Sequence, residues 1–208
     1  MYLPEHFAEL RVEVLQEALR GWGLATLVTT GPEGLDASHV PLLLEPAPGP
    51  CGRLLGHVAR PNPQWRATSD GSPALAIFLG PDAYVTPSWY ASKSDAGRVV
   101  PTWNYVAIHA HGTARFFEER ERLLEVVTRL TDRHEHARPH PWKVTDAPPD
   151  YVDALLEGIV GVELTITRLE GKWKASQNRS EADRRGVAEG LLGEGQAAMA
   201  RLVRDDGA

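Results

Sequence analysis

Apolar side chains recur every three or four positions between Pro4 and Arg20, with charged residues between them. This spacing places the apolar side chains on one face of a helix. Gly21 and Gly23 follow the last of them, and glycine commonly ends a helix. The pattern therefore predicts an amphipathic helix over residues 4–20.

After residue 23 the pattern changes to short apolar runs rich in β-branched residues, each closed by Gly or Pro. Such runs are typical of strands separated by tight turns. The predicted strands are Leu24–Thr30, Leu35–Glu45, Arg53–Ala59, Ala74–Leu79, Ala83–Tyr90, Val99–Phe117 and a hairpin of Gly161–Arg168 with Lys172–Ser176. About seven short strands with few helices between them predict a mainly β, antiparallel barrel or sandwich rather than a doubly wound sheet.

Helical spacing returns in three later segments, which are Glu118–Ala137, Tyr151–Ile159 and the tail Ser180–Asp205. We expect the tail helix to be weakened by its glycines, Gly186, Gly190, Gly193 and Gly195. A chain of 208 residues suits one domain with a buried core. The predicted organisation is a β domain over residues 1–179, with the N-terminal helix and a helical insertion at 118–159, followed by a helical tail over 180–208.

The composition excludes several classes of protein. The chain has 22 Lys+Arg and 28 Asp+Glu, so its formal net charge is −6, which disfavours coating nucleic acid or an anionic membrane through a general positive field. The single cysteine, Cys51, cannot form a disulfide within the chain or a cysteine-rich metal cluster. Early charges such as Glu5 and Arg11 interrupt any export signal, and the apolar runs are too short to span a bilayer. We therefore expect a cytoplasmic protein.

Three windows are richer in polar and aromatic residues than strands require. They are Gly56–Trp65 (GHVARPNPQW), Pro87–Lys93 (PSWYASK) continued by Val100–Tyr105 (VPTWNY), and Lys172–Arg179 (KWKASQNR). Each combines donors for an anion with Trp or Tyr, which suits a ligand with a planar ring and an anionic group. Flavin mononucleotide (FMN), other nucleotides and pyridoxal phosphate have this shape. The alternative is that these aromatics are ordinary core residues and the polar side chains satisfy loop backbones.

These windows, together with MYLPEHF at the start and HVP at His39–Pro41, resemble the PaiB family of FMN-binding negative transcriptional regulators. The resemblance covers residues 1 to about 179, and VPTWNY and SQNR together are its most specific part. It implies an FMN-binding split β-barrel, related to pyridoxamine 5′-phosphate oxidase, that forms homodimers with FMN at the subunit interface. Ala175 departs from the bulkier apolar residue that is more common before SQN in the family.

The resemblance makes FMN the expected cofactor, and the residue types indicate roles within the windows. For the phosphate we expect the cations Lys93 and Arg60 and the neutral donors Ser88, Thr102 and Asn62. For the isoalloxazine ring we expect the stacking surfaces Trp89, Tyr90 and Trp103 and the amides Asn104, Gln177 and Asn178. Arg179 or Lys174, placed near the N1–C2=O edge of the ring, would stabilise the reduced flavin. We also expect this last segment to reach the FMN of the partner subunit.

Histidines invite two further interpretations. His39 lies in the SHVP segment and either faces a substrate beside the flavin or satisfies a backbone carbonyl, and it is assigned no catalytic role. His109 and His111 share one face of a strand, but zinc would need a third ligand from elsewhere. His134, His136 and His140 have no common helical face. No metal site is predicted.

The leading functional hypothesis is an FMN-binding split-barrel protein that acts through its flavin rather than through strong direct contact with DNA. Direct DNA binding has little support, because the basic residues of 120–133 alternate with glutamates and no helix-turn-helix is recognisable. The alternative is a flavin-dependent reductase or oxidase of a small molecule, so the sequence leaves enzymatic activity open. A haem-handling split barrel is a third class, indicated only by the His109–His111 pair.

Overall fold

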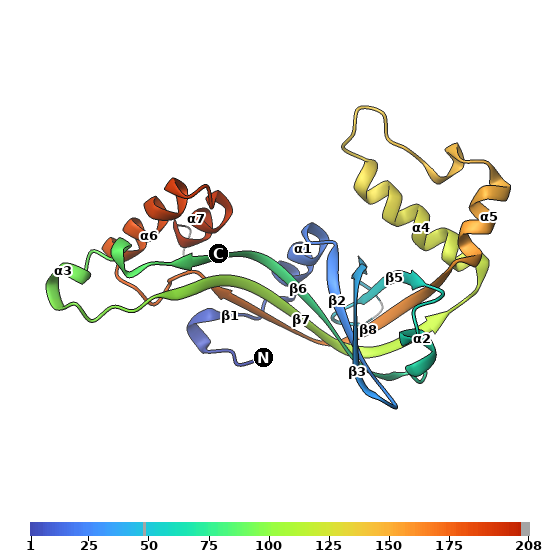
Figure 1. Ribbon diagram of the computed structural model, residues 1–208, viewed down its shortest axis with the longest axis horizontal. Coiled ribbons are helices and arrows are strands. Elements are labelled where there is room, and N and C mark those ends of the chain that lie inside the picture. Colours follow the sequence, from blue (N-terminus) through green and yellow to red (C-terminus); the bar gives the residue numbers. More distant parts are fainter. Residues whose placement is uncertain (48, 205–208) are drawn as a thin grey trace. The chain divides into compact units, whose positions relative to one another are not determined.

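The computed structural model describes residues 1–47 and 49–204 of the chain (Figure 1). Pro48 and the last four residues of the predicted tail lie outside the described residues. Within them, none of the helices combines the length and the apolar character needed to cross a membrane.

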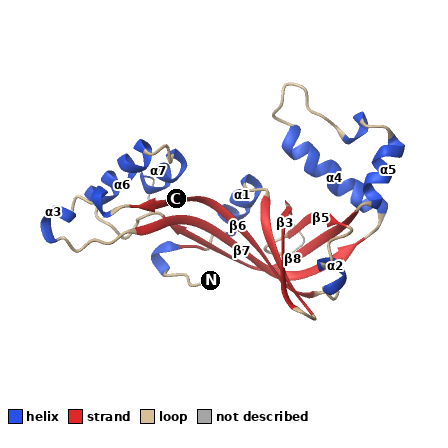
Figure 2. Ribbon diagram, viewed as in Figure 1, coloured by secondary structure: helices blue, strands red, loops and turns tan. Residues whose placement is uncertain are grey.

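Eight strands form a mainly antiparallel sheet, with helices outside it (Figure 2). Hydrogen-bonded neighbours follow the order β3-β2-β6-β7-β8-β5-β4, and β1 pairs with β8. The strands are β1 Ala8–Glu9, β2 Leu24–Gly31, β3 Gly34–Pro41, β4 Leu43–Glu45, β5 Arg53–Ala59, β6 Ser72–Val85, β7 Thr102–Phe117 and β8 Ile159–Lys174. The predicted fold class, antiparallel β with flanking helices, is confirmed.

The helices are short except for one near the middle of the chain. They are α1 Val12–Gly21, α2 Gln64–Ala67, α3 Lys93–Ala96, α4 Arg120–Glu135, α5 Pro149–Glu157, α6 Glu181–Gly193 and α7 Ala197–Arg204, with 3-10 turns η1 Glu5–Phe7, η2 Pro87–Trp89 and η3 Val144–Asp146. The two helices predicted over residues 118–159 are therefore present as α4 and α5. The predicted domain boundary at residue 179 stays a prediction.

The chain divides into two compact units. Unit 1 comprises Met1–Arg11, Leu79–Ile108 and the described part of Glu170–Ala208. Unit 2 comprises Val12–Phe78 and His109–Leu169.

Unit 2 is organised by two strand ladders. Strands β2 and β3 form a hairpin that ends in the pair Gly31↔Gly34, and Gly34 takes a φ of +113°, which L side chains rarely adopt. In the second ladder, β5 pairs with β4 and with β8. Helices α4 and α5 bury Leu123, Leu130 and Leu156 in an apolar cluster that also contains Leu55 of β5 and Phe117 of β7. The period-3.6 stripe predicted in this region thus packs the helical insertion against the strands.

Unit 1 joins the ends of the chain. Strand β1 pairs with β8 through Ala8↔Lys172 and Glu9↔Gly171. After β8, the hydroxyl of Ser180 accepts a hydrogen bond from the backbone N–H of Asp183 and caps the start of α6. The tail is therefore a well-formed pair of helices, α6 and α7, despite its glycines.

Three local predictions were wrong, two of them because residues that favour turns lie inside continuous strands. Gly80-Pro81-Asp82 does not divide β6, and the β2 ladder on β6 runs only from Ala74 to Ile77, so Pro81 removes no hydrogen bond from it. Glu170-Gly171 does not form a hairpin turn, because Gly171 pairs with Glu9 in an extended β8. Conversely, the predicted strand Leu35–Glu45 is interrupted at Leu42, whose N–H donates to the carbonyl of Gly23 at 2.7 Å.

The predicted N-terminal helix was also too long. Helix α1 begins only at Val12, and the preceding residues form a 3-10 turn and the short strand β1. The bond of Glu9 Oε1 with the backbone N–H of Arg11 (2.8 Å) and the ion pair of these two side chains fix the chain between β1 and α1. Sheet pairing by Ala8 and Glu9 therefore overrides helical spacing in the first ten residues.

Candidate functional site

Two of the windows singled out in the sequence meet in unit 1. Thr102 and Trp103 begin β7, and Lys174 ends β8. The ammonium of Lys174 donates to the hydroxyl of Thr102 at 2.5 Å and to the carbonyl oxygen of Trp103. Antiparallel strands thus bring the VPTWNY and KASQNR motifs, about 70 residues apart, to one place.

A buried pair of polar side chains fixes the turn that follows β8. Asn104 and Ser176 are 1% and 4% exposed, and they exchange hydrogen bonds, Asn104 Nδ2 to Ser176 Oγ at 2.9 Å and Ser176 Oγ to Asn104 Oδ1 at 3.3 Å. Ser176 has a φ of +64°, which is uncommon for a residue other than glycine. Gln177 accepts from the N–H of Ala175 at 2.7 Å and donates to the carbonyl of Trp173. The amides of Asn104 and Gln177 therefore hold the turn.

Three cations gather around this turn, and we call Lys172, Lys174 and Arg179 the cationic cluster. Within residues 1–47 and 49–204, none of the three forms an ion pair with a carboxylate. Lys172 is 7% exposed, donates to the carbonyl of Tyr2 at 3.0 Å and lies over the ring of Tyr105. Burial, together with the charges of Lys172 and Arg179, lowers the pKa of Lys174. An anion bound beside the cluster would relieve this repulsion.

Exposed aromatic rings lie on β7 and β6, next to β8 in the order of the strands. Trp103 of β7 is 55% exposed and Tyr84 of β6 is 46% exposed, and their rings meet edge to face with centroids 6.0 Å apart. Exposed aromatic side chains that lie together on a surface often mark a binding site. Trp103 therefore offers a stacking surface next to Lys174, whose ammonium donates to the carbonyl oxygen of Trp103.

The PSWYASK window is held by the tail helix, which sequence reasoning left without a role in the site. Asp183 of α6 accepts from the N–H of Ser92 at 2.9 Å and from its hydroxyl at 2.8 Å. Gly186 and Gly190 lie close to Trp89. A Cβ added at Gly186 would come 2.1 Å from the carbonyl oxygen of Trp89, and one added at Gly190 would come 2.3 Å from its ring. The signal that could have found this contact is the spacing of the two glycines, one helical turn apart on one face.

Within the same window, Tyr90 is a buried residue and Lys93 an exposed one. Tyr90 is 3% exposed, and the guanidinium of Arg179 lies 4.7 Å from its ring centroid. Burial raises the pKa of the Tyr90 hydroxyl, and the charge of Arg179 opposes that rise. The ammonium of Lys93 lies 3.4 Å from the hydroxyl of Ser88, and both residues are exposed. Lys93 and Ser88 are thus accessible to a ligand, whereas Tyr90 supports Arg179.

Ten of the twelve residues predicted to bind the cofactor lie in unit 1, and the other two, Arg60 and Asn62, lie in unit 2. The guanidinium of Arg60 binds the carboxylate of Glu118 and the carbonyl oxygens of Glu157 and Ile159. Asn62 donates to the hydroxyl of Ser38 at 2.8 Å and accepts from the backbone N–H of Gln64 at 2.9 Å. These side chains shape the loop between β5 and α2, and their role at a phosphate stays a prediction.

His39, His109 and His111 each lie beside another polar side chain of the sheet. His39 Nδ1 lies 3.0 Å from the hydroxyl of Thr26, its register partner across the β2–β3 hairpin. His109 and His111 lie on one face of β7 with ring centroids 6.0 Å apart, and burial lowers the pKa of both. The lowered pKa favours the neutral form of both imidazoles, and a neutral imidazole is not by itself evidence for a bound metal.

The fold is that of a split-barrel protein. Two solved structures share the fold: a FAD and heme binding protein from Mycobacterium smegmatis (TM-score 0.58, 16% identity, covering 80% of this chain and 73% of that one) and a conserved hypothetical protein from Mycobacterium tuberculosis (0.59, 14%, covering 87% and 95%). At such low identity these likenesses concern the fold alone.

The family follows from sequence. A family model described as "Putative FMN-binding domain" matches residues 1–168, so the chain belongs to this family. Protease synthase and sporulation protein PAI 2 of Bacillus subtilis is 33% identical over 208 residues, covering 99% of this chain and 97% of the relative. An uncharacterized protein of Emericella nidulans is 35% identical over 245 residues, covering 100% and 98%. The resemblance to the PaiB family is confirmed.

Proposed function

We propose that this protein binds FMN in unit 1, beside the cationic cluster and the exposed ring of Trp103. The observation that carries the proposal is the position of Lys174, which joins the VPTWNY and KASQNR motifs while lacking a carboxylate partner within the described residues. Family membership supports a flavin as the ligand. A bound flavin would supply electron-transfer chemistry that no side chain of this chain provides.

The donor set fits an anionic, planar ligand. Lys172, Lys174 and Arg179 provide positive charge without a bound carboxylate, and the hydroxyl of Thr102 lies within hydrogen-bond distance of Lys174. These groups suit either the phosphate, which is negatively charged in both redox states, or the N1–C2=O edge of the flavin, which carries negative charge when the flavin is reduced. Because the chain as a whole has a net charge of −6, this local positive charge has to provide the attraction.

The other predicted residues divide into ligand contacts and supports. Trp103, Lys93, Ser88 and Asn178 are exposed and are proposed to contact the flavin. Asn104, Gln177, Tyr90 and Trp89 are proposed to position those contacts, because their polar atoms or rings are already engaged by the protein.

A second copy of the chain is proposed to complete the site. Tyr84 and Trp103 form an exposed aromatic pair, and Val100 nearby in sequence is 64% exposed. A homodimer with FMN at its interface would cover this apolar surface. Light scattering of the purified protein should then give twice the mass of 22.8 kDa, and a monomer at all concentrations would contradict this part of the proposal.

A role in regulation is proposed to act through the flavin rather than through tight DNA contact. The acidic net charge and the engagement of Arg120, Arg122 and Arg129 by carboxylates support this, because these three cations are not free to bind phosphates. A mobility-shift assay at low salt should show no tight, sequence-selective binding. The alternative, a flavin reductase or oxidase, would appear as bleaching of the bound flavin by NADH or NADPH followed by reoxidation with a small acceptor.

The decisive test of flavin binding is titration of the purified protein with FMN, followed by absorbance and by chromatography of the flavin released on denaturation. Lys174→Ala should weaken FMN binding about tenfold or more, as expected for loss of a charged donor. The control Lys143→Ala removes an exposed lysine from unit 2 and should leave the FMN affinity unchanged. A protein that takes up no FMN would overturn the cofactor, and equal affinity of Lys174→Ala would overturn its placement.

A further inference from the structure

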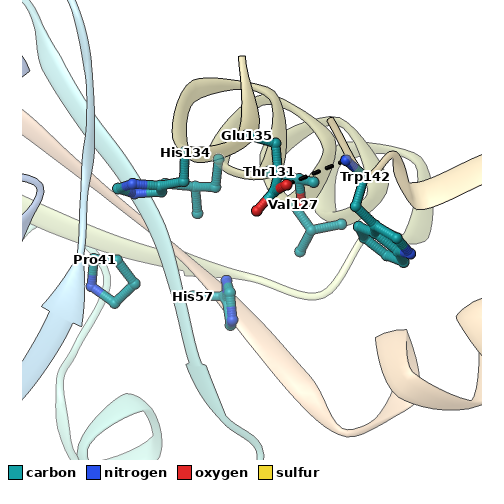
Figure 3. A pocket seen from close by; sticks show the side chains of 8 residues that line it. Pro41, His57, Val127, Thr131, His134, Glu135 and Trp142 are labelled. Carbon is teal, nitrogen blue, oxygen red and sulfur yellow. Dashed lines mark hydrogen bonds between the residues drawn. The ribbon is translucent and has the colours of Figure 1, made fainter. Parts of the chain in front are cut away.

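A pocket of about 390 Å³ lies beside helix α4 in unit 2 (Figure 3). Its walls are largely apolar and come from three places: Val127 and Leu130 of α4, Pro41 at the end of β3, and the indole of Trp142 from the loop after α4. Its volume and apolar lining are those of small-molecule sites, which usually combine such walls with a few polar groups. None of these residues belongs to the proposed flavin site.

His57 of β5 supplies one of those polar groups, and Figure 3 shows its ring below α4, between Pro41 and Trp142. Its Nδ1 atom is buried and has no hydrogen-bond partner within residues 1–47 and 49–204. Burial lowers the pKa of His57, so the ring is neutral near pH 7. A buried N–H without an acceptor is rarer than an acceptor without a donor. The favoured tautomer therefore carries its proton on Nε2, the nitrogen left to reach a ligand.

The other polar groups of the pocket are the imidazole of His134, one free hydroxyl and one carboxylate already in use. In the described part of the chain the hydroxyl of Thr131 has no hydrogen-bond partner, although it lines the pocket. The carboxylate of Glu135 pairs with Arg138 at 2.9 Å and accepts from the backbone N–H of Trp142 at 3.2 Å (Figure 3). The pocket thus offers hydrogen-bonding groups on His57, Thr131 and His134, and a carboxylate whose charge is balanced by Arg138.

We propose that this pocket binds an uncharged, planar aromatic molecule with an amide or carbonyl group on its edge. The ring would pack against Trp142 and Leu130, and the carbonyl oxygen would accept a hydrogen bond from His57, with Thr131 as a second polar contact. Apolar walls disfavour a charged or heavily hydroxylated ligand, because it would lose water without gaining partners. The proposal is independent of flavin binding, since the pocket shares no residue with the cationic cluster.

The test uses the full chain labelled with 5-fluorotryptophan and followed by ¹⁹F NMR, with benzamide as the probe. The resonance of Trp142, assigned with Trp142→Phe, should shift saturably with a dissociation constant on the order of 1 mM, the range expected of so small a ligand. His57→Leu should weaken this binding about fivefold, the effect of losing one neutral hydrogen bond. His140→Leu, an exposed histidine of the same loop, should leave binding unchanged.

Toluene, which has the ring without the amide, should bind more weakly than benzamide, and added FMN should not displace benzamide. If the Trp142 resonance does not shift, if His57→Leu binds benzamide as the wild type does, or if FMN competes, the proposal is overturned. Thr131→Val, a partly exposed helix position, provides the same test if His57→Leu does not fold, and it should also weaken benzamide binding. Equal binding by a folded Thr131→Val would overturn the proposal in that case.

Discussion

Asp183, in the first turn of helix α6, accepts two hydrogen bonds from Ser92, one from its backbone N–H at 2.9 Å and one from its hydroxyl at 2.8 Å. Asp183 is buried, and these bonds connect the tail helix with the loop that carries Lys93. Burial alone would raise the pKa of Asp183, but the hydrogen bonds from Ser92 and Ser180 and the charge of Arg179 lower it overall.

Replacing Asp183 should therefore destabilise this loop. Asp183→Ala removes both acceptors and should lower the free energy of unfolding by about 2–3 kcal/mol, the effect of losing charge-assisted bonds at a buried site. Chemical denaturation measures this change. Glu181→Ala removes an exposed carboxylate that pairs with Arg185, and it should change stability by less than about 0.5 kcal/mol. An equal loss in both variants would contradict the structural role of Asp183.

Gly190 provides a steric test of the same contact. A methyl group at this position would lie 2.3 Å from the indole of Trp89, so Gly190→Ala should displace the ring or the helix and cost about 1–3 kcal/mol. Gly193, on the same helix, has nothing within 4 Å of an added Cβ, so Gly193→Ala should be neutral or stabilising by up to about 1 kcal/mol. Denaturation of both variants checks the prediction, and stabilisation by Gly190→Ala would contradict it.

The Asn104–Ser176 pair should matter for both stability and ligand binding. Asn104→Ala would leave the buried hydroxyl of Ser176 without its partner and should cost about 1–3 kcal/mol. Because the turn after β8 also carries Arg179, FMN affinity should fall as well. Asn178→Ala, an exposed amide in the same turn, should leave stability unchanged. Fluorescence-detected denaturation and FMN titration measure the two effects, and a stable Asn104→Ala variant would contradict the first.

His57 predicts a pH dependence of stability with a defined sign. Burial lowers its pKa in the folded protein, so below about pH 6.5 the unfolded chain binds more protons at this site than the folded chain. Stability from the neutral ring is therefore fully present above the unfolded pKa and is lost as pH falls toward and through the folded pKa. The wild type should lose stability on acidification faster than His57→Gln, and their difference should be constant above pH 7. The opposite order would contradict the burial of a neutral ring.

The sequence predicted the antiparallel sheet and the windows that meet in unit 1, because strand periodicity and motif composition are local properties. It did not predict that β6 continues through Gly80-Pro81-Asp82 or β8 through Glu170-Gly171, since these residues favour turns locally. At Gly171 the extended backbone pairs with Glu9, which is distant in the sequence. The glycines of α6 were interpreted as weak points of a helix. Their actual partner, Trp89, lies about 100 residues earlier, so the spacing of the glycines indicates a close approach but does not identify what approaches.

The position of the Trp89 indole against α6 bears on how far sequence motifs define a working member of this family. The family model ends at residue 168, and the recognisable motifs end at Arg179, before α6 begins at Glu181. A shortened chain that kept every motif would leave one face of Trp89 open to water and would deprive Ser92 of its acceptor. Motif content alone is therefore an incomplete criterion, and relatives should be compared over the segment that contacts their equivalent of this tryptophan.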